Sequence, residues 1–359
     1  MIHQIKEVDS IQFSVLVNNE VDPISPSPNP DVKYPAFLTG VPLKPIQDGS
    51  RGDAQLEFRM DSICCGAHGL SLAIVSIPSP RTMLFDAGPE EQIWESNARR
   101  MNLDAAAIEH VHLSHWHRDH SGGMLRAIRT ISEARKAAGK PDGGVVTVDL
   151  HPDRPEYRGI QAGETLISME ADPTFEAMEA AGATLRLSSV PHAVLGDTFL
   201  VSGEVPRTTS YETGIRGGIR YETEAEGGGR WVPDTLILDE RFVVCNLKNK
   251  GLVVFAGCSH PGIVNIARHA LDLTGGQIPL LAVVGGYHLA DGDPAKMQST
   301  MDDLVALRPR IFMPGHCTGW RFCFKIEREL PEGSYVPCFG GTTYTLDGLV
   351  EEEEQGAKA

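Results

Sequence analysis

The 359-residue sequence has no apolar run near the roughly 18 residues that a membrane-spanning helix requires, which argues against an integral membrane protein. Its first ten residues, MIHQIKEVDS, lack the basic and apolar segments of a secretory signal. Basic residues are scarce, because 32 Lys and Arg against 48 Asp and Glu give a net charge of −16. This charge opposes binding to nucleic acid phosphates or anionic membrane surfaces. We expect a cytoplasmic protein whose partner is a small molecule.

Cysteines at the spacing of a zinc knuckle are also missing. The seven cysteines are odd in number and scattered, and the adjacent Cys64 and Cys65 are poorly placed to bridge each other. We therefore expect no disulfide framework, and most of the thiols are predicted to be reduced and buried. Apolar residues make up 41% and charged residues 22% of the chain, as in ordinary globular proteins. A chain of this length can bury a sizeable core without help from a disulfide or a metal.

Short apolar runs alternate with amphipathic stretches, a pattern that favours a layered α/β fold. Strands are expected where apolar runs end at turn residues, over 13–17, 70–75, 82–88, 110–114, 145–150, 235–240, 242–247, 252–257, 280–286 and 310–315. Helices are expected after Ser121, around 173–182, from Pro261 and around 294–308. The order of these elements predicts strands followed by helices in two successive parts of the chain.

Two long stretches lack such a pattern. Residues 19–66 are rich in proline and polar residues and are predicted to form a surface excursion. Residues 203–233 carry many glycines and charges and are predicted to form a mobile loop or lid. The last residues, 351–359, have the composition of a solvated acidic tail. We therefore expect one domain over residues 1–350, from which the two excursions extend.

The stretch HLSHWHRDHSGG, residues 112–123, contains the pattern H-x-H-x-D-H at His115, His117, Asp119 and His120. The apolar run before it predicts a strand, and side chains two apart at a strand end point the same way. His115 and His117 are therefore able to bind one ion, while the other two lie where the chain turns into a helix. Imidazole and carboxylate are ligands for zinc and also suit iron or manganese. The pattern predicts a metal site, against the alternative of a polar loop with accidental histidines.

Three later strand ends supply further candidate ligands. They are VVFAGCSHPG with Cys258 and His260, IFMPGHCTGW with His316 and Cys317, and AVVGGYHLADG with His288. Any one of these histidines is as well explained by a structural role. Together with the first cluster they favour ligand or acid–base roles in loops that converge on one site.

The remaining histidines and one arginine have weaker signals. His192 is an alternative ligand, but the strand–Gly–Cys–Ser–His context favours His260. His151 fits a place in the cleft or a structural role equally well, and Arg207 fits either a contact to an anionic substrate or a surface salt bridge. His110 and His112 precede the cluster in an alternating strand and are expected to be structural or to support the ligands. No role is expected for His3, His68 or His269.

Several motifs resemble known proteins. HLSHWHRDHSGG resembles the signature of the metallo-β-lactamase superfamily, and TMLFDAGP resembles the strand that precedes it there. The sequence also resembles the branch of dihydropterin-ribofuranosyl-aminobenzene phosphate synthase-like proteins, through GCSHPGIVNI, GGYHL, PGHCTGW, FSVLVNNEVDP, HGLSLAI and SGEVPR. The similarity runs from about residue 12 to 347. It implies a four-layer αβ/βα sandwich with mixed sheets and a metal pair at one sheet edge.

The resemblance also implies a ligand set. One metal would be held by His115, His117 and His260, and the other by Asp119, His120 and His316. Where the superfamily usually has a bridging aspartate, this sequence reads Gly257-Cys258. Cys258 is able to ligate as a thiolate, while a mononuclear site or a water bridge are the alternatives. We expect one or two Zn²⁺ ions per chain, with iron or manganese as alternatives.

Two more roles follow from the resemblance and from the chemistry of such centres. Asp86 would orient a ligand from behind. His288 has no equivalent among the usual ligands, and we interpret it as a contact to substrate phosphate or as a general acid.

The expected activity is hydrolysis of a small ester, lactone, thioester or phosphoester by metal-activated water. Asp119 and His288 are the predicted catalytic residues. The resemblance implies one alternative, a synthase-type transferase that condenses an aminobenzoate with phosphoribosyl pyrophosphate. A second alternative is an iron-dependent oxygenase or redox enzyme, because the same ligands are able to hold iron.

Overall fold

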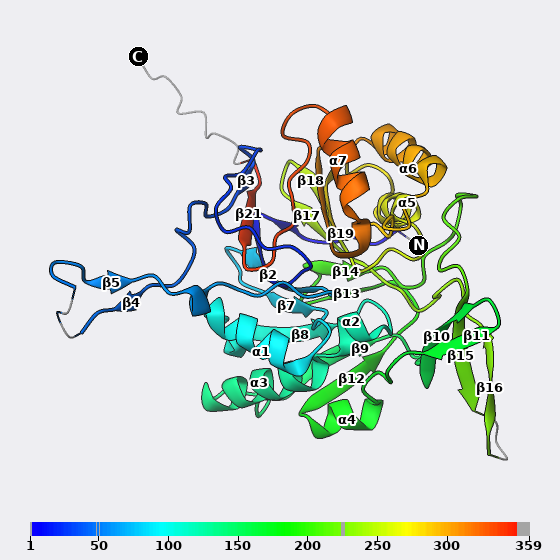
Figure 1. The fold of residues 1–359 in the computed structure, drawn as a ribbon, viewed down its shortest axis with the longest axis horizontal. Coiled ribbons are helices and arrows are strands. Elements are labelled where there is room, and N and C mark those ends of the chain that lie inside the picture. Colours follow the sequence, from blue (N-terminus) through cyan, green and yellow to red (C-terminus); the bar gives the residue numbers. More distant parts are fainter. Residues whose placement is uncertain (1, 48, 50, 224–226, 350–359) are drawn as a thin grey trace.

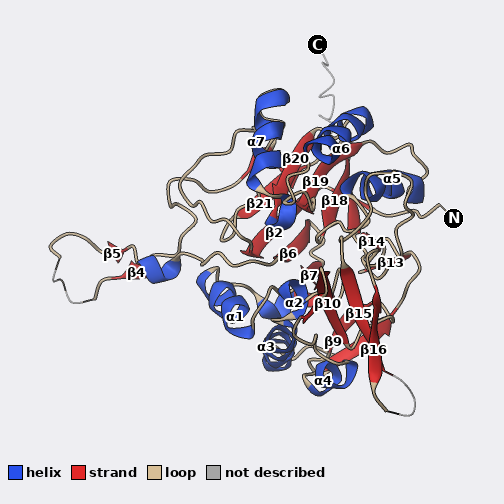
Figure 2. Ribbon diagram, turned by 45° about the vertical axis from the view of Figure 1, so that its right-hand side comes forward, coloured by secondary structure: helices blue, strands red, loops and turns tan. Residues whose placement is uncertain are grey.

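The structure is a computed structural model that describes residues 2–47, 49, 51–223 and 227–349. The predicted acidic tail at 351–359 lies outside the described residues. Two large mixed sheets pack face to face, and helices cover the outer face of each, so the predicted four-layer αβ/βα sandwich is confirmed (Figures 1 and 2). Within the described part, no helix is long and apolar enough to cross a membrane.

The first large sheet has eight strands in the order β12-β9-β8-β7-β6-β2-β21-β3. Strands β7, β8, β9 and β12 run parallel, so their carboxyl ends share one edge. The bounds in chain order are β2 Ser10–Val17, β3 Val32–Lys33, β6 Ser71–Ile77, β7 Thr82–Phe85, β8 Ile108–His112, β9 Val146–Leu150, β12 Ala183–Leu187 and β21 Thr343–Asp347.

The second large sheet has the order β13-β14-β17-β18-β19-β20, with β1 paired to β17. Here β18, β19 and β20 run parallel, and they carry the later histidine motifs at their carboxyl ends. The bounds are β1 Glu7–Val8, β13 His192–Val194, β14 Phe199–Val201, β17 Val243–Leu247, β18 Gly251–Ala256, β19 Leu280–Gly286 and β20 Ile311–Gly315.

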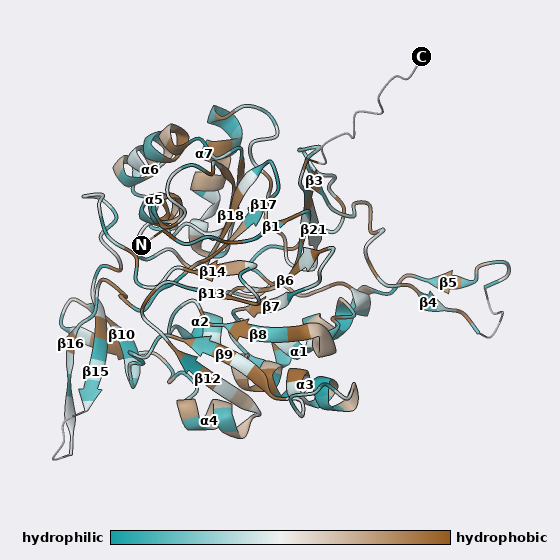
Figure 3. Cartoon of the chain, turned by 180° about the vertical axis from the view of Figure 1, so that it is seen from behind, coloured by the Kyte–Doolittle hydropathy of each residue, from teal (hydrophilic) through white to brown (hydrophobic). Residues whose placement is uncertain are grey.

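The core lies in three layers between these elements. Between the sheets, Phe13 of β2 stacks on Tyr344 at 5.1 Å and meets Phe255 of β18 edge-on at 5.4 Å. β18, with the sequence GLVVFA, is buried and apolar along its length (Figure 3), whereas the equally central β8, IEHVH, carries Glu109 and two histidines. Outside them, apolar helix faces complete two further clusters.

The helices bury one apolar stripe each. α3, Met124–Ala137, packs Ala127, Ile128 and Ile131 against the first sheet, a spacing that repeats every helical turn. α6, Pro294–Leu307, begins where it does because the Asp293 side chain accepts from Ala295 N and Lys296 N. The other helices are α1 Glu91–Arg100, α2 Arg118–Ser121, α4 Phe175–Ala180, α5 Ile263–Leu273 and α7 Trp320–Glu329.

The stretch 203–233 is not the loop that its composition predicted. It contains β15, Gly218–Thr223, and β16, Gly229–Pro233, which join β10, Tyr157–Ala162, and β11, Thr165–Ser168, in a separate antiparallel sheet. This sheet stands at the periphery of the molecule (Figure 1). Aromatic contacts across the strands, Tyr157 to Tyr221 and Tyr221 to Trp231, stabilise this sheet. The high glycine content of the segment gave no indication of them.

Part of the stretch 19–66 extends from the body, carrying the two-residue strands β4 Lys44–Pro45 and β5 Leu56–Glu57 and a short 3-10 helix, Met60–Ser62 (Figure 1), whereas β3 of the same stretch joins the first large sheet. The predicted strand at 235–240 is wrong, because this segment has no regular structure. Its Ile237 has a left-handed backbone with φ of 51°, which interrupts a strand. Helices α1 and α7 were not predicted, although each buries a short apolar stripe, with Trp94 and Ala98 in α1 and Phe322 and Ile326 in α7.

Candidate metal centre

The predicted ligands meet at the edge where the parallel strands end. His115, His117, Asp119 and His120 follow β8, and Cys258 and His260 follow β18. The 3-10 helix His316–Thr318 follows β20 directly. Because the two sheets are packed with these edges together, side chains that lie some 200 residues apart in the sequence come into contact. The convergence of loops that the motifs predicted is therefore observed.

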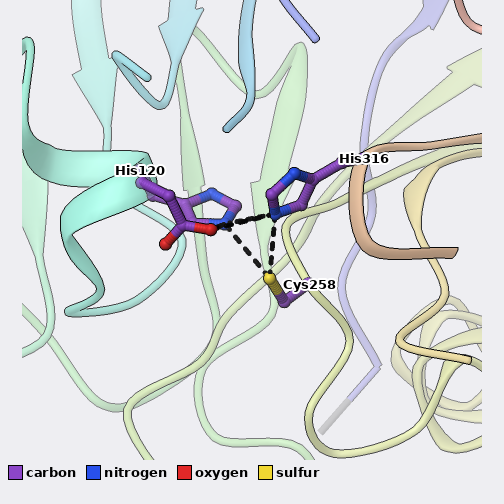
Figure 4. Close-up of side chains that lie close together, drawn as sticks. His120, Cys258 and His316 are labelled. Carbon is purple, nitrogen blue, oxygen red and sulfur yellow. Dashed lines mark hydrogen bonds and ion pairs between the residues drawn. The ribbon is translucent and has the colours of Figure 1, made fainter. Parts of the chain in front are cut away.

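One group of donor atoms joins Asp119, His120, Cys258 and His316, all within 4.8 Å of one another. The Nε2 atoms of His120 and His316 lie 3.2 Å apart, and each lies 3.2 Å from Cys258 Sγ (Figure 4). Asp119 Oδ2 lies 3.2 Å from His316 Nε2. A tetrahedral zinc site spaces its nitrogen and sulfur donors by about 3.3–3.6 Å. The spacing of these side chains therefore fits a metal ion at their centre.

A second group joins His115, Cys258 and His260. His117 is adjacent, because its Nδ1 lies 2.9 Å from His115 Nε2 and its ring centroid lies 4.8 Å from that of His260. Burial lowers the pKa of all three imidazoles well below the usual range, so they are neutral and able to bind a cation. Cys258 Sγ is common to both groups, at the place where the superfamily has its bridging aspartate.

Asp86 supports the first group from behind. Its Oδ1 accepts from Ser114 N at 2.7 Å, and its Oδ2 lies 2.6 Å from His120 Nδ1. This contact turns His120 Nε2 toward Cys258 and His316. Burial would lower the pKa of His120, but the carboxylates of Asp119 and Asp86 outweigh it and raise the pKa to about 9. Positive charge is therefore stabilised at this position, as a metal centre requires.

Glu240 supports the second group in the same way, and sequence reasoning missed it. Its Oε1 accepts from Ser259 N at 2.6 Å, and its Oε2 accepts from His260 N at 2.7 Å and lies 2.7 Å from His260 Nδ1. These contacts fix the ring so that His260 Nε2 is free for a metal. Burial raises the pKa of Glu240 to about 7, although the two backbone N–H groups oppose the shift. Glu240 was missed because the sequence TLILDE, residues 235–240, has the composition of a strand.

The substitution Glu240→Gln is expected to weaken metal binding about 10–100-fold, the usual effect of losing the hydrogen-bond partner of a ligand. The amide offers one acceptor where three N–H groups converge, so the His260 ring loses its fixed orientation. Competition with a chromophoric zinc chelator measures the affinity. Glu204→Gln is the matched control, since Glu204 contacts His151 and not a predicted ligand. Equal zinc affinity in Glu240→Gln and the native protein would contradict this role.

A buried ion pair holds the segment between His115 and His117. Trp116 N donates to Asp239 Oδ2 at 2.8 Å, and Arg158 Nη1 donates to Trp116 O at 2.7 Å. Arg158 also pairs with Asp239 directly. Both partners lie in segments without a recognisable sequence signal, so neither was predicted.

Polar residues near the amino end of the chain also reach the site. Asn18 Oδ1 accepts from His316 N at 2.8 Å, and Asn19 Oδ1 lies 3.1 Å from His316 Nδ1. His68 Nε2 lies 3.4 Å from Asp119 Oδ2, a contact that the sequence analysis did not predict. Asn18, Asn19 and His68 all fall within the motifs FSVLVNNEVDP and HGLSLAI, which carried the resemblance. These motifs therefore contained residues of the site, but they were used only as evidence of family resemblance.

Other predicted residues lie beside the centre. Arg207 donates to the backbone oxygens of His260 and Leu236, so its guanidinium braces a loop. His192 Nε2 lies 2.7 Å from Asp149 Oδ2, in a buried network with Arg241. His110, His112 and His151 also lie outside the donor groups. His110 Nε2 and His112 Nδ1 are buried 3.8 and 3.9 Å from the carboxylate oxygens of Asp149. His151 Nε2 lies 3.3 Å from Glu204 Oε1.

The centre opens into a cleft of about 550 Å³, within the usual range of roughly 300–1,000 Å³ for small-molecule sites. His117, Asp119, His260, His288 and His316 line it, together with the exposed Trp320 at its rim. The His288 ring centroid lies 4.5 Å from that of His260. All the residues that line this cleft are described, and none is lysine or arginine. A small molecule fits here, and a phosphate group in it would meet histidines but no lysine or arginine in the wall.

Comparisons with known proteins agree with this fold. The structure superposes with a TM-score of 0.61 on a crystal structure of a metal-dependent hydrolase of the β-lactamase superfamily, with 21% identity over 93% of this chain and 98% of that one. The chain therefore has the metallo-β-lactamase fold, and the predicted resemblance to this superfamily is confirmed. No family model matches the chain.

Two curated relatives come from Methanocaldococcus jannaschii. The chain is 27% identical to the 7,8-dihydropterin-6-methyl-4-(β-D-ribofuranosyl)-aminobenzene-5'-phosphate synthase, over 71% of this chain and 82% of that protein. It is 28% identical to an uncharacterised protein, over 73% of this chain and 88% of that protein. The resemblance to the synthase-like branch is thereby confirmed as well.

Proposed function

We propose that the protein is a metal-dependent hydrolase that cleaves a small ester, lactone, thioester or phosphoester with metal-activated water. The observation that carries the proposal is the convergence of buried imidazoles, a carboxylate and a thiol at the floor of a cleft of small-molecule size. Bound zinc lowers the pKa of water from about 16 toward 7 and stabilises negative charge on oxygen. One or two zinc ions per chain fit the donor groups.

The side chains around the donors supply the remaining steps of a hydrolysis. Asp119 lines the cleft, and the neighbouring imidazoles of His120 and His316 hold its pKa well below the usual range despite burial. An ionised carboxylate at this position accepts a hydrogen bond from the attacking water and orients it. His288 lines the same cleft and donates a proton to the leaving group.

A synthase-type transferase is the second candidate, and the similarity to the curated synthase favours it. Such a reaction on this chain would form a ribofuranosyl-aminobenzene phosphate from a phosphorylated sugar. The wall of the cleft contains histidines that could contact the phosphate of this sugar, but no lysine or arginine. Because phosphate groups are usually held by charge-assisted hydrogen bonds, this wall favours hydrolysis of an ester, lactone or thioester over the synthase reaction, and over a phosphoester as well.

The deciding experiment compares both reactions on one preparation. Metal-free protein is loaded with zinc or with iron and assayed against phosphoesters, lactones and thioesters, and for formation of the ribofuranosyl-aminobenzene phosphate. We expect hydrolysis of at least one class that a chelator abolishes and added zinc restores. Synthase activity without hydrolysis would support the transferase. Activity only with iron and oxygen would support the redox alternative.

A further inference from the structure

A third group of donor atoms lies beside the two already described. Cys258 Sγ, Cys317 Sγ and a ring nitrogen of His288 lie within 4.8 Å of one another. These residues follow β18, β20 and β19, three adjacent parallel strands, and all three line the cleft. Neither His288 nor Cys317 belongs to the two donor groups that match the predicted ligand set.

The backbone around this third group leaves room for the sulfur of Cys317. A Cβ atom at Gly286 would lie 2.6 Å from Cys317 Sγ and 2.7 Å from Gly257 O, so only glycine fits there. Cys317 Sγ donates to Cys258 O at 3.2 Å. The two thiols are therefore brought together by a close approach of three strand ends.

Cross-links between the loops hold these positions. Ser259 Oγ donates to Gly286 O at 2.5 Å, and Tyr287 N donates to Thr318 Oγ1 at 3.0 Å. His288 follows with a left-handed backbone, φ 48°, and its Nδ1 is buried without a hydrogen-bond partner in the described structure. A buried imidazole nitrogen without a partner is costly to keep unless a ligand satisfies it.

We propose that Cys258, His288 and Cys317 form a further cation site for a thiophilic metal ion such as zinc or cadmium. Two sulfurs and one imidazole are soft donors that select such ions over magnesium or calcium. A thiolate sulfur has three lone pairs, so Cys258 is able to bridge this cation to a neighbouring one. All three residues line the cleft, so a cation bound by them would be reached from it.

Occupancy of this site takes the coordinating ring nitrogen of His288 out of proton transfer. A lone pair that binds a cation no longer carries the proton that the leaving group needs. The third cation is therefore expected to inhibit the proposed hydrolysis. This consequence rests on the proposed function, whereas the existence of the site does not.

The test counts bound cadmium on the full chain. Metal-free Cys65→Ser protein serves as the background, because Cys65 is the exposed thiol beside Arg100 and would bind cadmium adventitiously. The background, Cys317→Ser and His288→Ala are titrated with cadmium under reducing conditions. Bound metal is measured by equilibrium dialysis, and sulfur ligation by ultraviolet charge-transfer absorption and cadmium NMR. Cys245→Ser, which removes a buried thiol of the core, is the matched control.

We expect Cys317→Ser and His288→Ala each to bind one cadmium fewer per chain than the background. Cys317→Ser is also expected to lose the NMR signal of a cadmium with two thiolate ligands, while Cys245→Ser keeps both. Far-ultraviolet circular dichroism checks that each variant is folded. If only one of the two variants folds, its cadmium content alone tests the site. Unchanged cadmium content and spectra in the folded variants would refute the site.

Inhibition by excess zinc is the second readout. It is expected in the background and absent in Cys317→Ser. If the cadmium count changes as expected but no substrate is hydrolysed, the site stands and the hydrolase assignment fails. If hydrolysis is observed and the count is unchanged, the site fails and the hydrolase assignment stands.

Discussion

Replacing His117 with alanine is expected to remove one equivalent of metal and to lower kcat/KM more than about a hundredfold. The loss should exceed the 10–100-fold effect of removing a mere hydrogen-bond partner of a ligand, because a donor atom itself disappears. His117 Nδ1 faces His115 Nε2 at 2.9 Å, and the ring is buried and neutral. Alanine leaves that side of the centre with no replacement donor within the same loop.

The measurement pairs metal analysis with steady-state kinetics on the preferred substrate class. His269→Ala is the matched control, since His269 lies on α5 and contacts Ser202 O rather than a predicted ligand. It should keep full metal content and activity. A His117→Ala protein that retains all its metal would show that the assignment of this ligand is wrong.

Replacing Arg158 with methionine is expected to lower the free energy of unfolding by about 3–5 kcal/mol, the effect of breaking a buried ion pair. The side chains of Arg158 and Asp239 are only 3% and 1% exposed. Methionine leaves the Asp239 carboxylate buried without its cation. It also removes the donor to Trp116 O and the 2.9 Å contact to Asp234, so the loop that carries His115 and His117 loses its support.

Urea unfolding of metal-free protein measures this effect without a contribution from the centre. Arg81→Met is the surface control, because the side chains of Arg81 and its partner Glu109 are 45% and 32% exposed, and it should cost no more than about 1 kcal/mol. Combining Arg158→Met with Asp239→Asn should recover much of the loss, since the unpaired charge is removed. An unchanged unfolding free energy for Arg158→Met alone would contradict the buried-pair argument.

The fold and the donor groups were accessible from the sequence because their signals are local. Apolar runs mark the central strands, and His115, His260 and His316 each follow such a run directly. The supporting residues were not accessible in this way. Glu240 and Asp239 act from a segment whose alternating apolar residues are typical of a strand. Its true course depends on the left-handed Ile237 and on partners that lie between 19 and 123 residues away in the sequence.

The same limit explains the peripheral sheet. Its strands 157–162 and 218–223 are separated by more than fifty residues, and a glycine-rich segment gives no local indication of the pairing. Tyr221 and Trp231 stabilise it through a contact across strands. Composition alone therefore predicted a loop where long-range pairing produces a sheet.

The shared sulfur of Cys258 has a practical consequence. Because one atom takes part in every donor group, a single oxygen added to it as sulfenic acid would disturb all of them at once. Samples handled in air would then show low metal content and little turnover for a reason unrelated to their sequence. Purification under a thiol reductant, with titration of free sulfhydryls before each assay, is therefore part of any fair measurement of this protein.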